Sequence, residues 1–237
     1  MHAEQVTIEG RDYTRTVWFS AGPKHKSHRL CVFLDGEYYL EKVGALAIVE
    51  KALASGRIHS MSFVFVPSNG PQSRHEDFVC NDRYARFVAE DIVQWAKSQS
   101  DSVRGEGNLV CGLSLSGLAS AYAALNHPRV FSSALSQSGS FWWSERRFAS
   151  LARKHRGIES RYWLSVGDEE IQEDVSHPPT GMHQGVSQLA GVQSAVAALR
   201  AGGAEVRHHV YRGGHAFDPW RNELADALQW LIGSECV

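Results

Sequence analysis

Residues 108–118 read Asn-Leu-Val-Cys-Gly-Leu-Ser-Leu-Ser-Gly-Leu, and this stretch decides both the fold and where to look for chemistry. Its first four residues form a short apolar run typical of a buried strand, and a Gly-rich turn with a central serine, Ser114, follows at once. An alanine-rich helix is expected directly behind it, at residues 118–126. A strand, a sharp turn and a helix in this order hold a serine on a strained turn, where its hydroxyl is able to act as a nucleophile.

Small residues must stand two positions to either side of such a serine. Gly112 meets this demand, and Ser116 stands where a second glycine is usual, although serine is small enough to fit. Ser114 also lies at the start of a helix, whose N–H groups favour developing negative charge. The alternative interpretation of the same stretch is a helix entry in which Ser114 or Ser116 is only the N-cap.

Working outward, short β-rich runs alternate with helical patterns along the chain. Strands are expected at 5–20 (one or two), 29–34, 60–66, 108–111, 130–137, 162–166 and 206–211, and helices at 40–55, 81–99, 118–126, 186–201 and 220–232. This alternation implies right-handed crossovers and a mainly parallel central sheet with helices on both faces. We therefore expect the α/β class and an α/β-hydrolase fold, with residues 1–237 as a single domain. The polar segment 172–184 is too irregular for either element and is expected to be a lid-like insertion or a plain surface loop.

The composition narrows the function classes. A net charge of -2 over 237 residues gives no electrostatic case for nucleic acid or an anionic membrane as partner. The first residues lack the pattern of a signal peptide, and no run approaches the ~20 apolar residues of a membrane helix, so a cytoplasmic monomer or homodimer is expected. The four cysteines lack zinc-ligand spacing, and Cys31 and Cys111 fall in predicted buried strands, so reduced thiols and no metal or cofactor are expected.

A serine hydroxyl is a weak nucleophile and needs a positioned base. In strand–turn–helix enzymes of this kind the order along the chain is serine, acid, histidine. His215 follows the strand predicted at 206–211, behind two glycines that let its loop reach back over the sheet. Three carboxylates follow the strand predicted at 162–166, and spacing alone does not choose among Asp168, Glu169 and Glu170.

A tetrahedral intermediate at Ser114 would need hydrogen-bond donors for its oxyanion. One donor is expected to be the backbone N–H of Leu115, the residue after the nucleophile. The other is expected from the loop after residue 34, at the N–H of Gly36 or Glu37, because glycine permits unusual backbone geometry there.

Four further segments follow one another along the chain: Leu-Asp-Gly-Glu-Tyr-Tyr at 34–39; Arg74, Glu76, Asn81 and Glu90; Ser-Gln-Ser-Gly-Ser-Phe-Trp-Trp at 136–143; and Gly-Gly-His at 213–215 with Trp220. In this order they resemble the esterase family that includes enterochelin (ferric enterobactin) esterases, antigen 85 mycolyltransferases and feruloyl esterases. The resemblance spans residues 29–230 and is greatest to the catalytic domain of enterochelin esterases. Two departures are Ser116 in place of the family's usual glycine and the extra N-terminal domain of enterochelin esterases, which is not expected here.

Carried residue by residue, the resemblance implies Ser114 as nucleophile and His215 as base. It places the acid three positions after the strand-end glycine, on Glu170, with Asp168 as second choice. Arg74, Trp142 and Trp143 would then contact substrate, with Arg146 and Arg147 completing a basic, aromatic pocket suited to an anionic aromatic ester. The alternative is that the aromatic residues are core and the arginines form a solvated helix face.

The resulting hypothesis is a serine carboxylic-ester hydrolase that works through an acyl-enzyme on a small-molecule ester. Siderophore-type lactones, aromatic esters and small acyl esters are the expected substrates. One alternative is an acyltransferase that uses the same residues, and another is a non-catalytic α/β-hydrolase-like binding protein, for which Ser116 would be a sign of decay. A metal site at His177 and His183 in the 172–184 segment is disfavoured, since two histidines on an irregular loop are weak ligand spacing.

Overall fold

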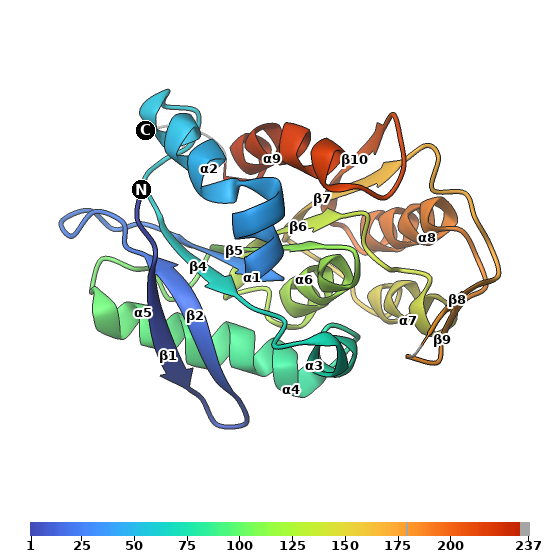
Figure 1. The fold of residues 1–237 in the computed structure, drawn as a ribbon, viewed down its shortest axis with the longest axis horizontal. Helices are drawn as coiled ribbons and strands as arrows, with labels where there is room; N and C mark the ends of the chain where they lie inside the picture. Colours follow the sequence, from blue (N-terminus) through green and yellow to red (C-terminus); the bar gives the residue numbers. More distant parts are fainter. Residues whose placement is uncertain (179, 233–237) are drawn as a thin grey trace.

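The computed structural model describes residues 1–178 and 180–232 of the chain. Its centre is an eight-stranded sheet with the order β1-β2-β4-β3-β5-β6-β7-β10 (Figure 1). Strand β2 runs antiparallel to β1 and β4, and the other neighbouring pairs of this sheet are parallel. The strands are β1 (Glu4–Glu9), β2 (Thr14–Ser20), β3 (Leu30–Leu34), β4 (Ser62–Val66), β5 (Asn108–Leu113), β6 (Phe131–Gln137), β7 (Arg161–Gly167) and β10 (Glu205–Tyr211).

Helices cover both faces of the sheet and bury its apolar strands (Figure 1). One face carries α1 (Gly36–Tyr38), the π-helical segment η1 (Tyr39–Val43), α2 (Ala45–Ala54) and α9 (Phe217–Ile232). The other carries α3 (Pro71–Asp77), α4 (Asp82–Arg86), the π-helical η2 (Phe87–Ile92), α5 (Val93–Gln99), α6 (Leu115–Asn126), α7 (Trp143–Ala152) and α8 (Gln188–Ala201). Every residue of β3, β4 and β5 is buried, as expected for parallel strands covered on both sides.

The predicted α/β-hydrolase fold is confirmed by this architecture and by solved structures of the same fold described below. The expectation that residues 172–184 hold no regular element is wrong. Strand β8 (Val175–His177) pairs antiparallel with β9 (Met182–Gln184) in a separate hairpin. These strands are only three residues long, so no alternating pattern develops in the sequence, and contacts with the rest of the fold hold them instead.

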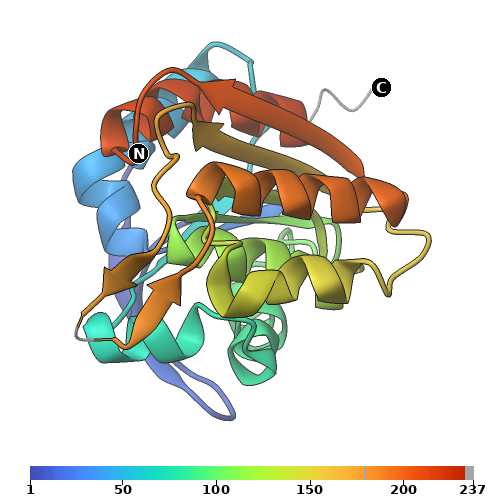
Figure 2. The same cartoon turned by 90° about the vertical axis from the view of Figure 1, so that its right-hand side faces the viewer.

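The hairpin lies beside the ends of α7 and α8 and reaches toward α3 (Figure 2). Helix α3 itself begins at Pro71, a residue that suits the first helical position because it has no N–H to leave unpaired. No helix among residues 1–178 and 180–232 is long and apolar enough to cross a membrane. Cys31 and Cys111 are buried free thiols on neighbouring strands, whereas Cys236 lies outside the described residues.

Candidate active site

The turn between β5 and α6 holds Ser114 in a conformation that side chains rarely adopt. Its backbone angles are φ 54° and ψ −122°, so the residue is strained and its side chain is turned out of the helix it precedes. Glycine is required at position 112, because a Cβ there would lie 2.0 Å from the carbonyl oxygen of Ser116. Residues 112–116 therefore fold as the predicted strained turn, called the elbow below.

Ser116 is fully buried and bonded within the elbow. Its Oγ accepts a hydrogen bond from the N–H of Leu113 at 2.9 Å and donates one to the carbonyl of Leu113 at 2.8 Å. The hydroxyl thus closes the turn on itself where the family usually has glycine. Ser116 is not among the residues lining the cavity at the elbow, whereas Ser114 is.

His215 meets Ser114 from the loop after β10. Gly213 adopts φ 122°, a conformation that favours glycine and lets the loop turn back toward the elbow. The Nε2 of His215 lies 3.0 Å from Oγ of Ser114 and accepts its hydrogen bond. The imidazole stands perpendicular to the ring of Trp220, with 4.9 Å between ring centroids.

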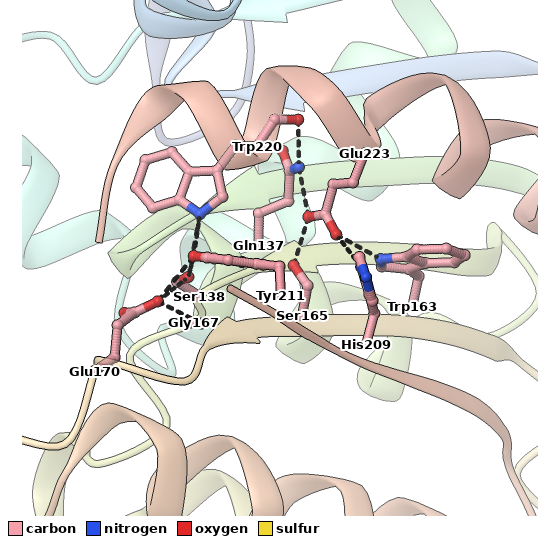
Figure 3. Close-up of polar contacts among 10 residues, drawn as sticks. All are labelled: Gln137, Ser138, Trp163, Ser165, Gly167, Glu170, His209, Tyr211, Trp220 and Glu223. Atoms are coloured by element: carbon pink, nitrogen blue, oxygen red, sulfur yellow. Dashed lines mark hydrogen bonds and ion pairs between the residues drawn. The ribbon is translucent and has the colours of Figure 1, made fainter. Parts of the chain in front are cut away.

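Glu170 holds the other side of the imidazole. Its Oε2 accepts a hydrogen bond from Nδ1 of His215 at 2.6 Å. Its Oε1 accepts from Oγ of Ser138 at 2.7 Å and from both Oη of Tyr211 and the N–H of Gly167 at 2.8 Å (Figure 3). Burial by itself raises the pKa of Glu170, but the hydrogen bond and charge of His215, the Gly167 N–H and the Ser138 hydroxyl outweigh it and lower the pKa. The carboxylate is therefore kept ionised.

The two other candidate carboxylates do not reach His215. Asp168 accepts a hydrogen bond from the N–H of Gly213 at 2.8 Å, so it braces the histidine loop through the backbone. Glu169 lines the cavity rather than the imidazole. Of the three residues that spacing left open, the geometry brings Glu170 to the histidine, as the family resemblance implies.

The expected oxyanion donors come from two helix starts, where N–H groups lack a partner within the helix. Leu115 is the first residue of α6 and lines the cavity, whereas Gly36 and Glu37 open α1 and lie outside the cavity lining. Strands β3 and β5 are parallel neighbours, so the loop after β3 emerges beside the elbow. The side chain of Glu37 is engaged elsewhere, because it accepts hydrogen bonds from the N–H and hydroxyl of Ser68.

A buried ion pair fixes this loop. Asp35 has φ 55° and is fully buried, and the guanidinium of Arg74 binds its carboxylate through Nε at 2.9 Å and Nη2 at 2.8 Å. Burial raises the pKa of Asp35, although Arg74 opposes the shift. Arg74, a candidate substrate contact, thus already has an anionic partner while it lines the cavity.

A cavity of about 450 Å³ opens at Ser114. Trp142 lines it, with His177 of the β8–β9 hairpin stacked on the indole at 5.0 Å between centroids and 6° between planes. Trp143, also predicted to contact substrate, instead borders an adjacent hollow. The cavity walls are formed by Arg74, His75, Ser114, Leu115, Ser140, Trp142, Glu169, Glu170, Gln172, Val175, His177, Met182, Gln184, Gln188, Gly214 and His215.

Three contributors escape the sequence-based reasoning. Ser138 and Tyr211 hydrogen-bond the carboxylate of Glu170, and His177 covers Trp142. Ser138 lies within the 136–143 motif, and a polar residue just after a buried strand could have indicated a contact with the site. Tyr211 and His177 carry no comparable signal, because their partners are distant in sequence.

Comparison with known proteins identifies the family of this chain. The family model described as "Putative esterase" matches residues 11–231. Iron(III) enterobactin esterase of Dickeya dadantii is 26% identical over 97% of this chain, which covers 53% of that protein. Iron(III) enterobactin esterase of Escherichia coli K12 is 29% identical over 56% of this chain, and the match covers 34% of that protein. The chain thus spans a third to about half of the length of these relatives.

Solved structures share the fold. An enterobactin esterase from Shigella flexneri, crystallised in the presence of enterobactin, superposes with a TM-score of 0.81 at 22% identity, over 98% of this chain and 59% of that one. A ferulic acid esterase superposes with a TM-score of 0.75 at 15% identity, over 98% of both chains. The resemblance to enterochelin esterases predicted from the sequence is confirmed, and these neighbours establish the fold.

Proposed function

The chain belongs to the Putative esterase family, and on that basis we propose that it hydrolyses carboxylic esters with Ser114 as nucleophile, His215 as general base and Glu170 as the acid. One observation carries the proposal: two hydrogen bonds in line, 3.0 Å from Ser114 to His215 and 2.6 Å from His215 to Glu170, at the edge of a cavity. Nucleophile, base and orienting carboxylate within hydrogen-bond reach are the arrangement that serine acyl transfer requires.

In the first half of the reaction, Oγ of Ser114 attacks the ester carbonyl carbon while Nε2 of His215 takes the hydroxyl proton. Glu170 accepts from Nδ1–H, holds the tautomer that leaves Nε2 free, and stabilises the imidazolium that forms. The N–H of Leu115 and that of Gly36 or Glu37 are proposed to stabilise the oxyanion. The intermediate collapses, the alcohol leaves with the proton from His215, and an acyl group remains on Ser114.

The second half repeats the same steps with water. His215 takes a proton from water, the resulting nucleophile attacks the acyl carbon, and the carboxylic acid leaves as Ser114 regains its proton. No cofactor or metal is required by this sequence of steps.

The substrate is proposed to be a small-molecule ester with an aromatic group. Trp142, its stacked partner His177 and Met182 give the cavity an aromatic and apolar wall, while Gln184 and Gln188 add polar groups. Siderophore-type lactones and aromatic esters both fit this description, and relatives named as enterobactin esterases support the former. Function in the cytoplasm, without nucleic acid or membrane partners, remains a prediction from the sequence.

The test is hydrolysis of an ester panel that includes 4-nitrophenyl acetate, feruloyl esters and enterobactin-type lactones, with Ser114→Ala as control. Labelling with a fluorophosphonate should place one phosphonyl group on Ser114, with loss of fluoride, in the wild type. A folded wild type that neither reacts with the probe nor hydrolyses any ester of the panel would contradict the proposal. The non-catalytic binding protein would then be the better interpretation. Faster product formation with added alcohol, as a transferred ester, would identify the acyltransferase instead.

A further inference from the structure

A second buried carboxylate, that of Glu223, lies under α9 and outside the cavity at Ser114. Its side chain is only 3% exposed, and it points from the helix onto three neighbouring strands (Figure 3). The strand register pairs Gln137 of β6 with Ser165 of β7, and Ser165 with His209 of β10. These three side chains therefore form one row across the sheet and leave it on the same face, toward Glu223.

Four donors meet this carboxylate. Its Oε1 accepts hydrogen bonds from Nε2 of Gln137 at 2.8 Å and Oγ of Ser165 at 2.5 Å. Its Oε2 accepts from Nδ1 of His209 at 2.7 Å and, more weakly, from Nε1 of Trp163 at 3.3 Å. A carboxylate is stable in such a buried position only when its lone pairs are satisfied, so these donors fix α9 in one register on the strands.

Gln137 connects this carboxylate to the elbow. Its Nε2 also donates to the carbonyl of Trp220 at 2.9 Å, and its Oε1 accepts from the hydroxyl of Tyr39 at 2.9 Å. Its backbone carbonyl accepts the N–H of Ser114 at 2.8 Å. Gln137 thus joins α9 and η1 through its side chain, and the turn at Ser114 through its backbone carbonyl.

Trp220 connects α9 to the acid. Its Nε1 lies 3.1 Å from Oγ of Ser138 and 3.0 Å from Oη of Tyr211, and these two hydroxyls are 2.6 Å apart. The hydroxyls of Ser138 and Tyr211 each donate to Oε1 of Glu170. The indole N–H of Trp220 donates to the oxygens of these two hydroxyls and so orients them toward the carboxylate.

The chain order makes this anchoring relevant to the imidazole. Helix α9 begins at Phe217, two residues after His215. A shift of the helix start would therefore move the imidazole relative to Ser114. Stability alone is a weak explanation of Glu223, because well-packed apolar residues are often at least as stabilising as a buried ion pair.

We propose that Glu223 is a positioning residue: by anchoring α9 to Gln137, Ser165 and His209, it holds His215 in line between Ser114 and Glu170. The inference rests on the proposed function, since it concerns the geometry of the same hydrolysis. Glu223 touches neither substrate nor the reacting atoms.

The test compares Glu223→Gln with Asn108→Ala. The first variant keeps the side-chain shape but puts an amide donor against groups that already donate. The second is the matched control, because Asn108 is fully buried, accepts from the N–H of Leu30 and donates to the carbonyl of Arg104 at the opposite end of β5. For each, kcat and KM for 4-nitrophenyl acetate, the rate of fluorophosphonate labelling and the melting temperature are measured, together with the downfield proton signal of the His215 Nδ1–H.

Glu223→Gln should lower kcat and the labelling rate about 10- to 100-fold, with KM within about twofold, and shift the His215 proton signal. Asn108→Ala should lower the melting temperature with kcat and that signal unchanged. An active wild type whose Glu223→Gln variant melts earlier but keeps its kcat and labelling rate would overturn the inference alone. An inactive, unlabelled wild type would overturn the proposed function and this inference with it.

If Glu223→Gln does not fold, Ser165→Ala and His209→Gln decide the question, because each removes one donor and leaves the carboxylate in place. A fall of roughly threefold or more in kcat in either variant, the size of one lost hydrogen bond, supports the positioning role. Unchanged kcat in both overturns it.

Discussion

The molecule contains two histidine–glutamate pairs with nearly the same dimensions. Nδ1 of His215 lies 2.6 Å from Glu170, and Nδ1 of His209 lies 2.7 Å from Glu223. The side chains are 42% and 3% exposed in the first pair and 41% and 3% in the second. They differ at the other ring nitrogen: Nε2 of His215 accepts from Ser114, whereas no hydroxyl in the described part of the chain bonds Nε2 of His209.

This difference shows that an oriented imidazole is not by itself a catalytic site. The first pair gains its proposed chemistry from the strained turn at Ser114 and from the cavity beside it. The second pair also borders a hollow on the surface, so a hollow alone does not separate the two pairs. The hydrogen bonds of the second pair instead hold α9 in place on the strands. The predictions below test that division.

The largest effect is expected from removing the hydroxyl that distinguishes the two pairs. Ser114→Ala should lower kcat/KM about 10⁴-fold or more, because no other hydroxyl among residues 1–178 and 180–232 is bonded to His215, while the melting temperature stays close to that of the wild type. The measurement is steady-state hydrolysis of 4-nitrophenyl acetate with calorimetry. Activity that survives the substitution would contradict Ser114 as nucleophile.

The next largest effect separates the two glutamates. Glu170→Gln should lower kcat roughly 10³- to 10⁴-fold, because the amide cannot stabilise the imidazolium and favours the wrong tautomer. That loss should exceed the one expected for Glu223→Gln, which acts through α9. Both are measured as kcat per active site, titrated with a fluorophosphonate.

Asp168→Asn provides the matched control for the acid. Its side chain still accepts the Gly213 N–H, so kcat should stay within about threefold of the wild type. If Asp168→Asn lost its kcat and Glu170→Gln stayed active, the acid of the site would be Asp168 and not Glu170.

The first pair was largely predictable from the sequence, and the second was not. Ser114 and His215 can be identified from their neighbours in the sequence, because a glycine stands two positions before the serine and a Gly-Gly pair stands before the histidine. The acid needed the family resemblance, because carboxylates at 168–170 are equivalent until the chain folds and only Glu170 turns toward the imidazole. The parallel sheet followed from apolar runs that require cover on both faces.

The second pair joins residues from β6, β7, β10 and α9, and no local pattern links them. Its one available signal was a charged residue, Glu223, three positions after Trp220 on the buried face of the closing helix. The β8–β9 hairpin was missed for a related reason, since its three-residue strands depend on contacts such as the stacking of His177 on Trp142. Elements held by tertiary contacts leave little trace in a single sequence.

A smaller effect is expected at the departure from the family pattern. Ser116→Ala removes two hydrogen bonds to Leu113 and should lower the free energy of unfolding by about 1–3 kcal/mol, because the Leu113 N–H is left buried. Its kcat should stay within about threefold of the wild type. Chemical denaturation and ester hydrolysis check the two parts, and loss of activity here with an active Ser114→Ala would make Ser116 the nucleophile.

The smallest effect is the pH dependence of the second pair. The hydrogen bond from His209 to Glu223 raises the pKa of His209; burial lowers it, the charge of Glu223 raises it, and Arg207 and Asp226 exert smaller opposing effects. A raised folded pKa means that protonation favours the folded state. The stabilisation is therefore complete below about pH 6.5, the unfolded value, and is lost as the pH rises through the raised folded pKa.

The difference in melting temperature between the wild type and His209→Gln should accordingly be greatest near the lower end of the range from about pH 6 to 9 and shrink as the pH rises. The neighbouring His208 has the opposite slope, since burial and the charges of Arg200 and His209 lower its pKa; the parts due to burial and Arg200 are common to both proteins and cancel in the comparison. A difference that stays constant across this range would mean that His209 serves Glu223 only as a neutral donor. The two pairs would then be alike in shape but not in charge.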